Sequence, residues 1–387
     1  MKKPLYIILI ILLISIMSCN KNQNSIIESN FKFAQNQYRK MLEKLPDANK
    51  LPRTIEENGQ LKTVSSSDWT SGFFPGALWY IFEYTNKQNW KNAAEKYTQM
   101  LKEERYNSGT HDIGFMMFCS YGNGYRLTKN SAYRDILITS AKTLSTRFDS
   151  TVGCIKSWDW NEEVWQFPVI IDNMMNLELL FWASEVTGNP KYHDIAVSHA
   201  NTTIEHHFRK DYSTYHVVNY DTTTGKVINK QTWQGYADSS CWSRGQAWAL
   251  YGYTMCYRFT NDNKYLEQAQ HIAEYILNHD NLPADMVPYW DFNVPNIPDT
   301  PRDASAAAII ASSLYELDNY ADNKNYRKAA DKILLSLSSK KYKSHRSNFI
   351  LDHSVGSKPS DSEVNVPLIY ADYYFLEANL RKQKFRR

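Results

Sequence analysis

Short polar motifs stand directly before several long apolar stretches of the sequence, and many contain a carboxylate, an arginine or a tryptophan. Carboxylates can give and take protons, arginine can pair with an anion, and an indole ring can stack on the apolar face of a sugar. These residues could therefore bind and protonate a ligand if the fold brings them together. The motifs are Asp68–Trp69, His111–Asp112, Ile171–Asn173, Trp242–Gly245, Arg302–Asp303 and Ser362–Glu363.

Helix capping is the simplest alternative explanation of these motifs. The side chains of Asp, Ser and Asn accept hydrogen bonds from the free N–H groups at the start of a helix, so capping accounts for any single motif. It does not account for the Trp and Arg residues beside so many of these caps. Where the amino ends of several helices converge, their dipoles favour an anionic ligand. Two carboxylates at one opening also raise the pKa of one of them.

A repeated turn indicates which elements position the motifs. Asn, Gly or Pro ends an apolar helical run, and an aromatic residue a few positions later begins an amphipathic run. Each turn is therefore predicted to join the two helices of a hairpin, whereas strand-like stretches such as Tyr215–Val218 are few. The turns are at Thr85–Asn86, Thr128–Asn130, Thr187–Pro190, Thr260–Asn261 and Asp322–Asn323.

The hairpins predict about twelve helices of two alternating kinds. The helices expected near residues 73–84, 113–127, 173–186, 244–259, 303–318 and 365–383 are apolar all round. Those expected near residues 31–46, 89–105, 131–148, 190–208, 263–279 and 323–339 carry Lys, Glu and Gln on one face. A helix that is apolar on every side must be buried. The pattern therefore predicts an all-α, single-domain (α/α)6 barrel, in which the amino ends of the inner helices meet at one mouth.

Composition excludes several classes of protein. Of the 387 residues, 43% are hydrophobic and 22% are charged, so the chain can build a large core and is not disordered. A net charge of +3 without a basic run argues against nucleic-acid binding. Cys119, Cys154, Cys241 and Cys256 lack a paired spacing and are expected to be buried thiols. No metal-ligand spacing appears, so no metal or other cofactor is expected.

The amino-terminal segment predicts a lipid anchor. A positive start at Met1–Lys3 precedes an apolar run over Leu5–Met17, which is too short for a membrane-spanning helix. The run ends with a small residue before Cys19 and resembles a bacterial lipobox, which implies cleavage before Cys19 and lipid on this residue. More than one acyl chain gives stable anchoring. The alternative is an ordinary signal peptide that happens to end near a cysteine.

These signals divide the chain into a signal peptide over residues 1–18, a tether over 19–30 and a barrel over 31–387. The tether is polar and contains Asn, Lys and Ser, as a flexible spacer would. We therefore expect the protein in the periplasm or cell envelope, with all membrane contact through Cys19.

Six segments follow one another along the chain: His111–Phe115, Ile171–Asn176, Gln234–Asp238, Trp242–Trp248, Arg302–Ala307 and Val366–Tyr374. Together they resemble glycoside hydrolase family 88, the unsaturated glucuronyl hydrolases. Any one segment alone would be weak, but their order makes the resemblance specific. The resemblance covers roughly residues 30–385, and it implies the same (α/α)6 barrel that the hairpins predict.

The resemblance implies hydrolysis of oligosaccharides that end in a 4,5-unsaturated uronic acid, the products of polysaccharide lyases acting on chondroitin, hyaluronan or heparin. The enol ether of that sugar is protonated at C4 and hydrated at C5, in contrast to direct displacement at the anomeric carbon. By its match to the family motif, Asp172 is the acid and base. Asp112 matches the second carboxylate, which lies against the sugar.

Other positions match substrate-binding residues of the family. Trp160 competes with Trp158 for the role of a stacking platform, and Trp233 stands where a smaller or polar residue is expected. The alternatives are core packing for the tryptophans and an ordinary Asp–Arg bridge for Arg244. The matching residues are Trp69, Trp158, His216, Thr232, Gln234, Trp242, Arg244 and Trp248.

A loop over His353–Lys358 precedes the last inner helix and is the region that influences acceptance of sulfated sugars in the family. Its serines, Ser354 and Ser357, and Lys358 are spaced differently from the family pattern, so a plain polar loop is an equal alternative. Two other functions stay open at this stage. One is a rhamnogalacturonyl hydrolase that acts on pectin fragments, and the other is a lipoprotein that binds glycans without catalysis.

Overall fold

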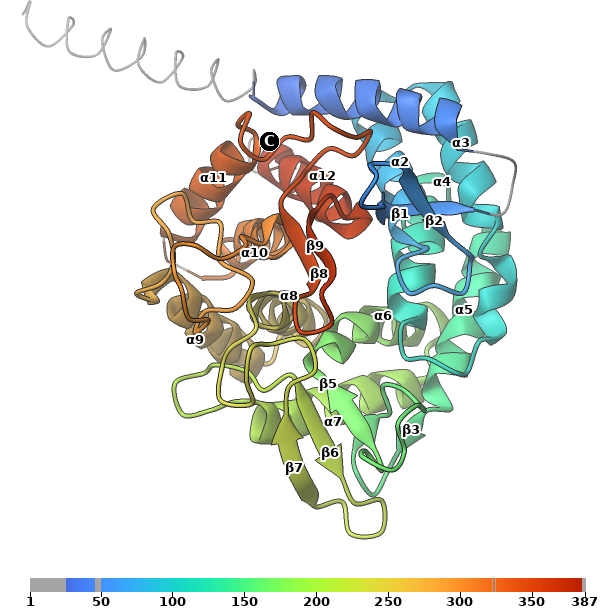
Figure 1. Cartoon of the computed structure of the whole chain (residues 1–387). Coiled ribbons are helices and arrows are strands. Elements are labelled where there is room, and N and C mark those ends of the chain that lie inside the picture. Colours follow the sequence, from blue (N-terminus) through green and yellow to red (C-terminus); the bar gives the residue numbers. More distant parts are fainter. Residues whose placement is uncertain (1–25, 46–49, 322, 324, 385–387) are drawn as a thin grey trace, which may run out of the picture.

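The computed structural model describes residues 26–45, 50–321, 323 and 325–384, which form two concentric rings of helices (Figure 1). Helices α12 and α2 pack together and close the inner ring. The predicted (α/α)6 barrel is therefore confirmed. In chain order, the inner ring contains α2 (Phe73–Thr85), the π-helix η2 (Gly114–Gly122) with α4 (Asn123–Thr128), the 3₁₀ helix η3 (Ile171–Asn176) with α6 (Leu177–Thr187), α8 (Ser243–Thr260), α10 (Ala304–Leu317) and α12 (Ile369–Lys384).

Burial separates the two rings as the sequence predicted. Every residue of α10 is buried, whereas the outer helix α9 buries the face that carries Tyr265, Ala269, Ile272 and Ile276. A helix that is half-buried needs only one apolar stripe. The outer ring consists of a helix over residues 26–44, α3 (Gln88–Gln99), η1 (Lys102–Tyr106), α5 (Ser131–Ser145), α7 (Pro190–His207), α9 (Asn263–Asn278) and α11 (Asn325–Leu337).

The turns of the hairpins use the polar residues that predicted them. Helices α2 and α8 end at Asn86 and Asn261, whose backbones are left-handed with φ of 52° and 54°. Asn adopts this conformation more readily than most residues. The next outer helix then begins at a side-chain cap, as Asp262 accepts a hydrogen bond from the N–H of Lys264 at the start of α9.

Short antiparallel strands lie in the connections, and the sequence predicted only the region of β6. In the three-stranded sheet, Val218 of β6 lies opposite Val169 and Lys230. The pairs are β1 (Leu51–Ile55) with β2 (Leu61–Val64), β3 (Phe148–Asp149) with β4 (Cys154–Ile155), β6 (Val217–Tyr220) with both β5 (Pro168–Ile170) and β7 (Val227–Gln231), and β8 (Ser354–Ser357) with β9 (Ser362–Val366).

The last inner helix starts later than predicted. Residue 365 was expected to begin it, but α12 begins at Ile369, and the Ser362–Glu363 motif lies in strand β9. Pro367 explains the difference, because the residue before a proline avoids helical backbone angles. The motif therefore belongs to the β8–β9 hairpin, which Figure 1 shows reaching over the centre of the ring.

The amino-terminal assignments are only partly within the described residues. The described part of the first outer helix starts at residue 26, inside the segment assigned to the tether. Asn30 is buried, and its Nδ2 donates to Ser338 Oγ at 2.8 Å and to Asn379 Oδ1 at 2.9 Å, so the barrel includes this residue. Residues 1–18 and Cys19 lie outside the described residues. Across the described helices, none is long and apolar enough to cross a membrane.

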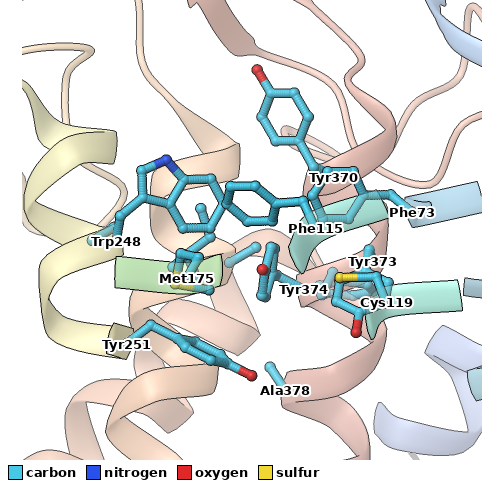
Figure 2. Packing of buried hydrophobic residues seen from close by; sticks show 14 of the residues in the cluster. Phe73, Phe115, Cys119, Met175, Trp248, Tyr251, Tyr370, Tyr373, Tyr374 and Ala378 are labelled. Atoms are coloured by element: carbon cyan, nitrogen blue, oxygen red, sulfur yellow. The ribbon is translucent and has the colours of Figure 1, made fainter. Parts of the chain in front are cut away.

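Buried aromatic rings fill the axis of the barrel beneath the mouth (Figure 2). The Phe115 ring lies 5.5 Å from that of Phe73 and 5.1 Å from that of Trp248, and Trp248 lies 5.3 Å from Tyr374. Tyr370 completes this aromatic plug, with its ring 5.9 Å from Phe73. The barrel is therefore closed below its mouth. As predicted, the thiols of Cys119, Cys154, Cys241 and Cys256 are free and buried.

A close backbone contact fixes η2 against η3. A Cβ atom placed on Gly114 would lie 2.4 Å from the Cα of Asn176, and Asn176 Oδ1 accepts a hydrogen bond from the N–H of Phe115 at 2.9 Å. Asp112 lies two residues before η2, and Asp172 lies within η3. The glycine therefore sets how closely the two carboxylate-bearing segments approach.

We expect Gly114→Ala to lower the free energy of unfolding by about 1–3 kcal/mol, because the new methyl group must push η2 away from η3. Chemical denaturation measures the change. Gly109→Ala is the matched control, since its Cβ would meet only Asn107 Oδ1 at 3.5 Å, an ordinary contact. Equal stability of the two variants would show that the contact does not hold these segments together.

Candidate active site

A cavity of about 330 Å³ opens at the mouth of the barrel and contains many of the residues that the sequence singled out. Its volume is near the lower end of the range for small-molecule sites. The predicted residues that line it are Trp69, Asp112, Trp158, Asp172, Gln234 and Arg244. Trp160 and Trp233 line it as well.

Asp172 is the carboxyl best suited to donate a proton. It lies in η3 and makes no helix-capping hydrogen bond there, so capping does not explain it. Burial raises its pKa to about 7, an effect that Arg244 opposes and the nearby Asp112 increases. A carboxyl with this pKa is partly protonated at neutral pH and can act as a general acid.

His216 faces Asp172 as a neutral donor. Its Nδ1 accepts hydrogen bonds from the backbone N–H groups of Trp233 and Gln234 at 3.0 and 3.1 Å, so the ring proton is assigned to Nε2. Nε2 lies 3.7 Å from Asp172 Oδ2. Burial, followed by the charge of Arg244, lowers the pKa of His216 to about 3. The imidazole is therefore uncharged at neutral pH and can orient the carboxyl or a bound ligand.

Asp112 is held by its immediate neighbours. Its Oδ2 accepts a hydrogen bond from Thr110 Oγ1 at 2.9 Å, and its Oδ1 lies 3.4 Å from Nε2 of His111. Burial lowers the pKa of His111, so this imidazole does not supply a full positive charge at neutral pH. Asp112 makes no capping hydrogen bond to η2 and is free to face the cavity that it lines.

Arg244 links the cavity floor to the β8–β9 hairpin. Its side chain is 1% exposed and lies 3.3 Å from Asp303, which caps α10. The guanidinium also donates to the carbonyl oxygens of Val355 and Gly356. The Asp–Arg bridge considered as an alternative is therefore present. Because Arg244 also lines the cavity, its charge acts on Asp172 as well.

The remaining predicted residues lie behind the cavity wall. His216, Thr232, Trp242 and Trp248 do not line the cavity. Trp248 belongs to the aromatic plug, and its indole N–H lies near enough to Asp172 to lower the pKa of that carboxyl. The Trp242 ring packs 4.7 Å from His216 and 4.5 Å from the Arg244 guanidinium. These tryptophans therefore support the site instead of forming a stacking surface.

Thr232 has a local structural role. Its Oγ1 accepts the N–H of Gly235 at 2.8 Å, and its own N–H donates to Asp238 at 2.7 Å. The side chain thereby shapes the turn that presents Gln234 to the cavity. The amide of Gln234 in turn donates to the carbonyl oxygen of Gly356 at 3.1 Å, which joins this turn to the β8–β9 hairpin.

Several lining residues were not predicted. Arg53 of β1 binds Glu363 of β9 at 2.6 Å and Asp68 at 2.8 Å, and Tyr370 forms part of the wall. Asp68 and Glu363 stood in polar motifs, but nothing in the local sequence indicated that a strand residue would pair with both. This arrangement fixes the first hairpin to the last.

The polar loop before α12 is arranged differently from the expectation. Ser357, Ser360 and Ser362 line the cavity, whereas Ser354 is buried within β8. Lys358 does not line it, and its Nζ donates to Asp361 at 3.0 Å. Hydroxyl groups therefore face the cavity from this hairpin, and Lys358 is already paired.

The family model for Glycosyl Hydrolase Family 88 matches residues 40–385 of this sequence. The chain belongs to glycoside hydrolase family 88. It is 49% identical over 369 residues to the unsaturated glucuronyl hydrolase of Formosa agariphila, a match that covers 94% of this chain and 92% of that protein. It is also 33% identical to the unsaturated chondroitin disaccharide hydrolase of Streptococcus pneumoniae, over 83% of each chain.

The crystal structure of an unsaturated glucuronyl hydrolase specific for heparin superimposes on this family 88 barrel with a TM-score of 0.91. The two sequences are 46% identical, and the match covers 94% of this chain and 98% of that chain. The resemblance inferred from the ordered motifs is thus confirmed, and the protein is a glycoside hydrolase by family.

We expect Asp172→Asn to make the protein more stable than the wild type at pH 8 but not at pH 5. The folded-state pKa of Asp172 is raised to about 7. The wild type therefore holds this proton more tightly when folded and loses stability as pH rises from the unfolded pKa through about 7. An asparagine has no charge to bury. Thermal unfolding at both pH values measures the difference, and a pH-independent shift would contradict the raised pKa.

Proposed function

We propose that this protein is an unsaturated glucuronyl hydrolase that removes the 4,5-unsaturated uronic acid from the non-reducing end of glycosaminoglycan oligosaccharides. The observation that carries the proposal is the buried Asp172, whose pKa is raised to about 7 beside Asp112 in a tryptophan-lined cavity. The relatives support a glycosaminoglycan substrate, since their names specify glucuronyl, chondroitin or heparin substrates.

In the first step, Asp172 donates its proton to C4 of the unsaturated sugar. The electron pair of the C4–C5 double bond forms the new C–H bond, and positive charge develops at C5 and on the ring oxygen. The negative charges of Asp172 and Asp112 at the mouth stabilise this cation. A neutral His216 suits the step, because a charged imidazolium 3.7 Å from Asp172 would oppose formation of the cation.

In the second step, water adds to C5 and gives its proton to the Asp172 carboxylate, which restores the acid. The product is a hemiketal at C5. The hydroxyl proton passes to the ring oxygen as the bond between C5 and that oxygen breaks, and C5 becomes a ketone. The freed C1 hemiacetal then becomes an aldehyde, and its hydroxyl proton passes to the oxygen of the departing oligosaccharide. One carboxyl thus serves as acid and then base, so a pKa near neutrality suits both roles.

Asp172→Asn tests the proposed chemistry. The amide cannot donate the proton, so we expect turnover to fall by about 10²–10⁴-fold with little loss of substrate binding. Loss of the ultraviolet absorbance of the enol ether, in lyase-made disaccharides, follows the reaction. Asp361→Asn is the control, because this carboxylate is 84% exposed and does not line the cavity. Retention of more than about a tenth of the wild-type rate would exclude Asp172 as the acid.

The same assay distinguishes the other candidate functions. A protein that only binds glycans would leave the absorbance of every disaccharide unchanged. A rhamnogalacturonyl hydrolase would consume the unsaturated disaccharide made from rhamnogalacturonan and spare those made from chondroitin, hyaluronan and heparin. Comparing initial rates on these four substrates decides the question.

We further propose that Cys19 carries a lipid anchor and that the mature protein begins at this residue in the periplasm or cell envelope. The lipobox-like Ile16–Cys19 segment supports this proposal. The chain between Cys19 and residue 26 is short and polar, so the barrel would sit close to the membrane.

Partitioning between water and a detergent phase tests the anchor. We expect the full-length protein to enter the detergent phase and a protein that starts at Ser25 to stay in water, folded and active, because its truncation removes none of the described residues. Cys19→Ala should lose the lipid mass in mass spectrometry. Detergent partitioning of the shortened protein would place the membrane contact elsewhere.

A further inference from the structure

Three tryptophans form a partly exposed surface at the rim of the active-site cavity, which we call the outer tryptophan platform (Trp160, Trp165 and Trp233). Trp160 is 44% exposed and Trp233 is 43% exposed, whereas Trp165 is 2% exposed beneath them. The ring centroids of Trp160 and Trp233 lie 5.1 Å apart, and each lies within 5.4 Å of Trp165. Large exposed aromatic surfaces in a cavity wall commonly mark a binding site.

The platform is fixed in place before any ligand binds. The indole N–H of Trp165 donates to Gln231 Oε1 at 2.7 Å, which anchors the buried ring to strand β7. The backbone N–H of Trp233 donates to Nδ1 of His216, which faces Asp172. Direct contacts through His216 therefore connect the platform with the proposed catalytic acid. Such preorganisation lowers the entropic cost of binding.

The tryptophans are ordered outward from the acid. Trp158 is the half-buried member, with its ring 6.5 Å from His216. Trp160 stacks on Trp158 at 4.9 Å and 24°, and Trp233 follows Trp160 at the rim. A chain with its unsaturated end at Asp172 would meet Trp158 first and the platform afterwards.

The charges around the cavity indicate what the platform binds. Of the described residues that line the cavity, the arginines are Arg53 and Arg244, and both are paired with carboxylates. Near Trp160, Asp159 is bound by Arg147 at 2.7 Å and by Lys156 at 3.1 Å. The platform thus offers apolar ring faces and no unpaired cation, which suits the C–H face of a sugar and not a sulfate group.

On the basis of the proposed function, we propose that the outer tryptophan platform is a binding subsite for the sugar that follows the leaving-group sugar, so that the protein favours chains longer than a disaccharide. Stacking on an aromatic face contributes affinity only when that third ring is present. A disaccharide ends before it reaches the platform.

The Trp160→Ala/Trp233→Ala double variant tests the subsite. The readout is kcat/KM on the unsaturated disaccharide and the unsaturated tetrasaccharide. Hyaluronan, heparin and unsulfated chondroitin each supply one such pair, and both members of a pair are made with the same lyase. We expect the wild type to favour the tetrasaccharide and the variant to lose about tenfold on it, with less than about a twofold change on the disaccharide. An unchanged tetrasaccharide-to-disaccharide ratio, or equal losses on both, would overturn the proposal.

Two control variants separate stacking from general damage. Trp160→Phe/Trp233→Phe keeps aromatic faces and should retain most of the tetrasaccharide preference. Tyr106→Ala removes an aromatic side chain that is 60% exposed but lies outside the cavity, and it should change neither rate. If sedimentation shows that the double Ala variant loses a dimer formed by the wild type while the substrate ratio stays constant, the platform is a contact between copies of the chain and the subsite is excluded.

Failure of the proposed function would be recognised separately. In that case the wild type would hydrolyse none of the disaccharides. Calorimetry of tetrasaccharide binding to Asp172→Asn, with and without the two Trp→Ala substitutions, then tests the platform without turnover. Weaker binding of about tenfold on loss of the rings supports the subsite, and equal binding rejects it.

Discussion

Burial of the Asp172 carboxyl removes water from it and favours its neutral form, and much of the barrel maintains that condition. The aromatic plug excludes water from below, and Trp158 lies beside the cavity. Arg244 would strongly favour the charged form of Asp172 if its guanidinium were unpaired. Its bond to Asp303 and its contacts with two backbone carbonyls offset part of that charge. The pKa near 7 is thus a balance among burial and Asp112, which raise it, and Arg244, which lowers it.

The same contacts connect distant parts of the chain. Arg244 on α8 holds the β8–β9 hairpin, which comes from the far end of the sequence. Arg53 ties β1 to that hairpin through Glu363. Gln234 joins the turn that Thr232 shapes to Gly356 of the same hairpin. The mouth is therefore a polar network built across an apolar barrel, and its groups are positioned by elements that are far apart in the sequence.

The hydrophobic pattern of the sequence was sufficient to predict the inner and outer rings of helices, because a helix that is apolar on all sides must lie in the interior. The ordered motifs also predicted Asp112 and Asp172 as the carboxylates of the site, and both line the cavity. Contacts between distant strands could not be predicted. The pairing of Arg53 with Glu363 depends on two hairpins that meet only in the folded protein, and the cavity-facing positions of Ser357 and Ser360 depend on the register of β8 with β9. Trp242 and Trp248 had the expected residue type, but their burial depends on packing that spacing does not specify.

The aromatic plug closes the inner end of the cavity, so the cavity has one opening. The rings of the aromatic plug pack together across the barrel axis (Figure 2). One of them, Tyr370, lines the same cavity as Asp112 and Asp172. A polymer cannot thread through such a pocket, so only the tip of a chain can reach Asp172, and an internal linkage cannot. The released sugar must also leave by the opening through which it entered. The product must therefore leave before the next substrate can enter. This geometry alone restricts the protein to exolytic cleavage, one sugar at a time from the chain end.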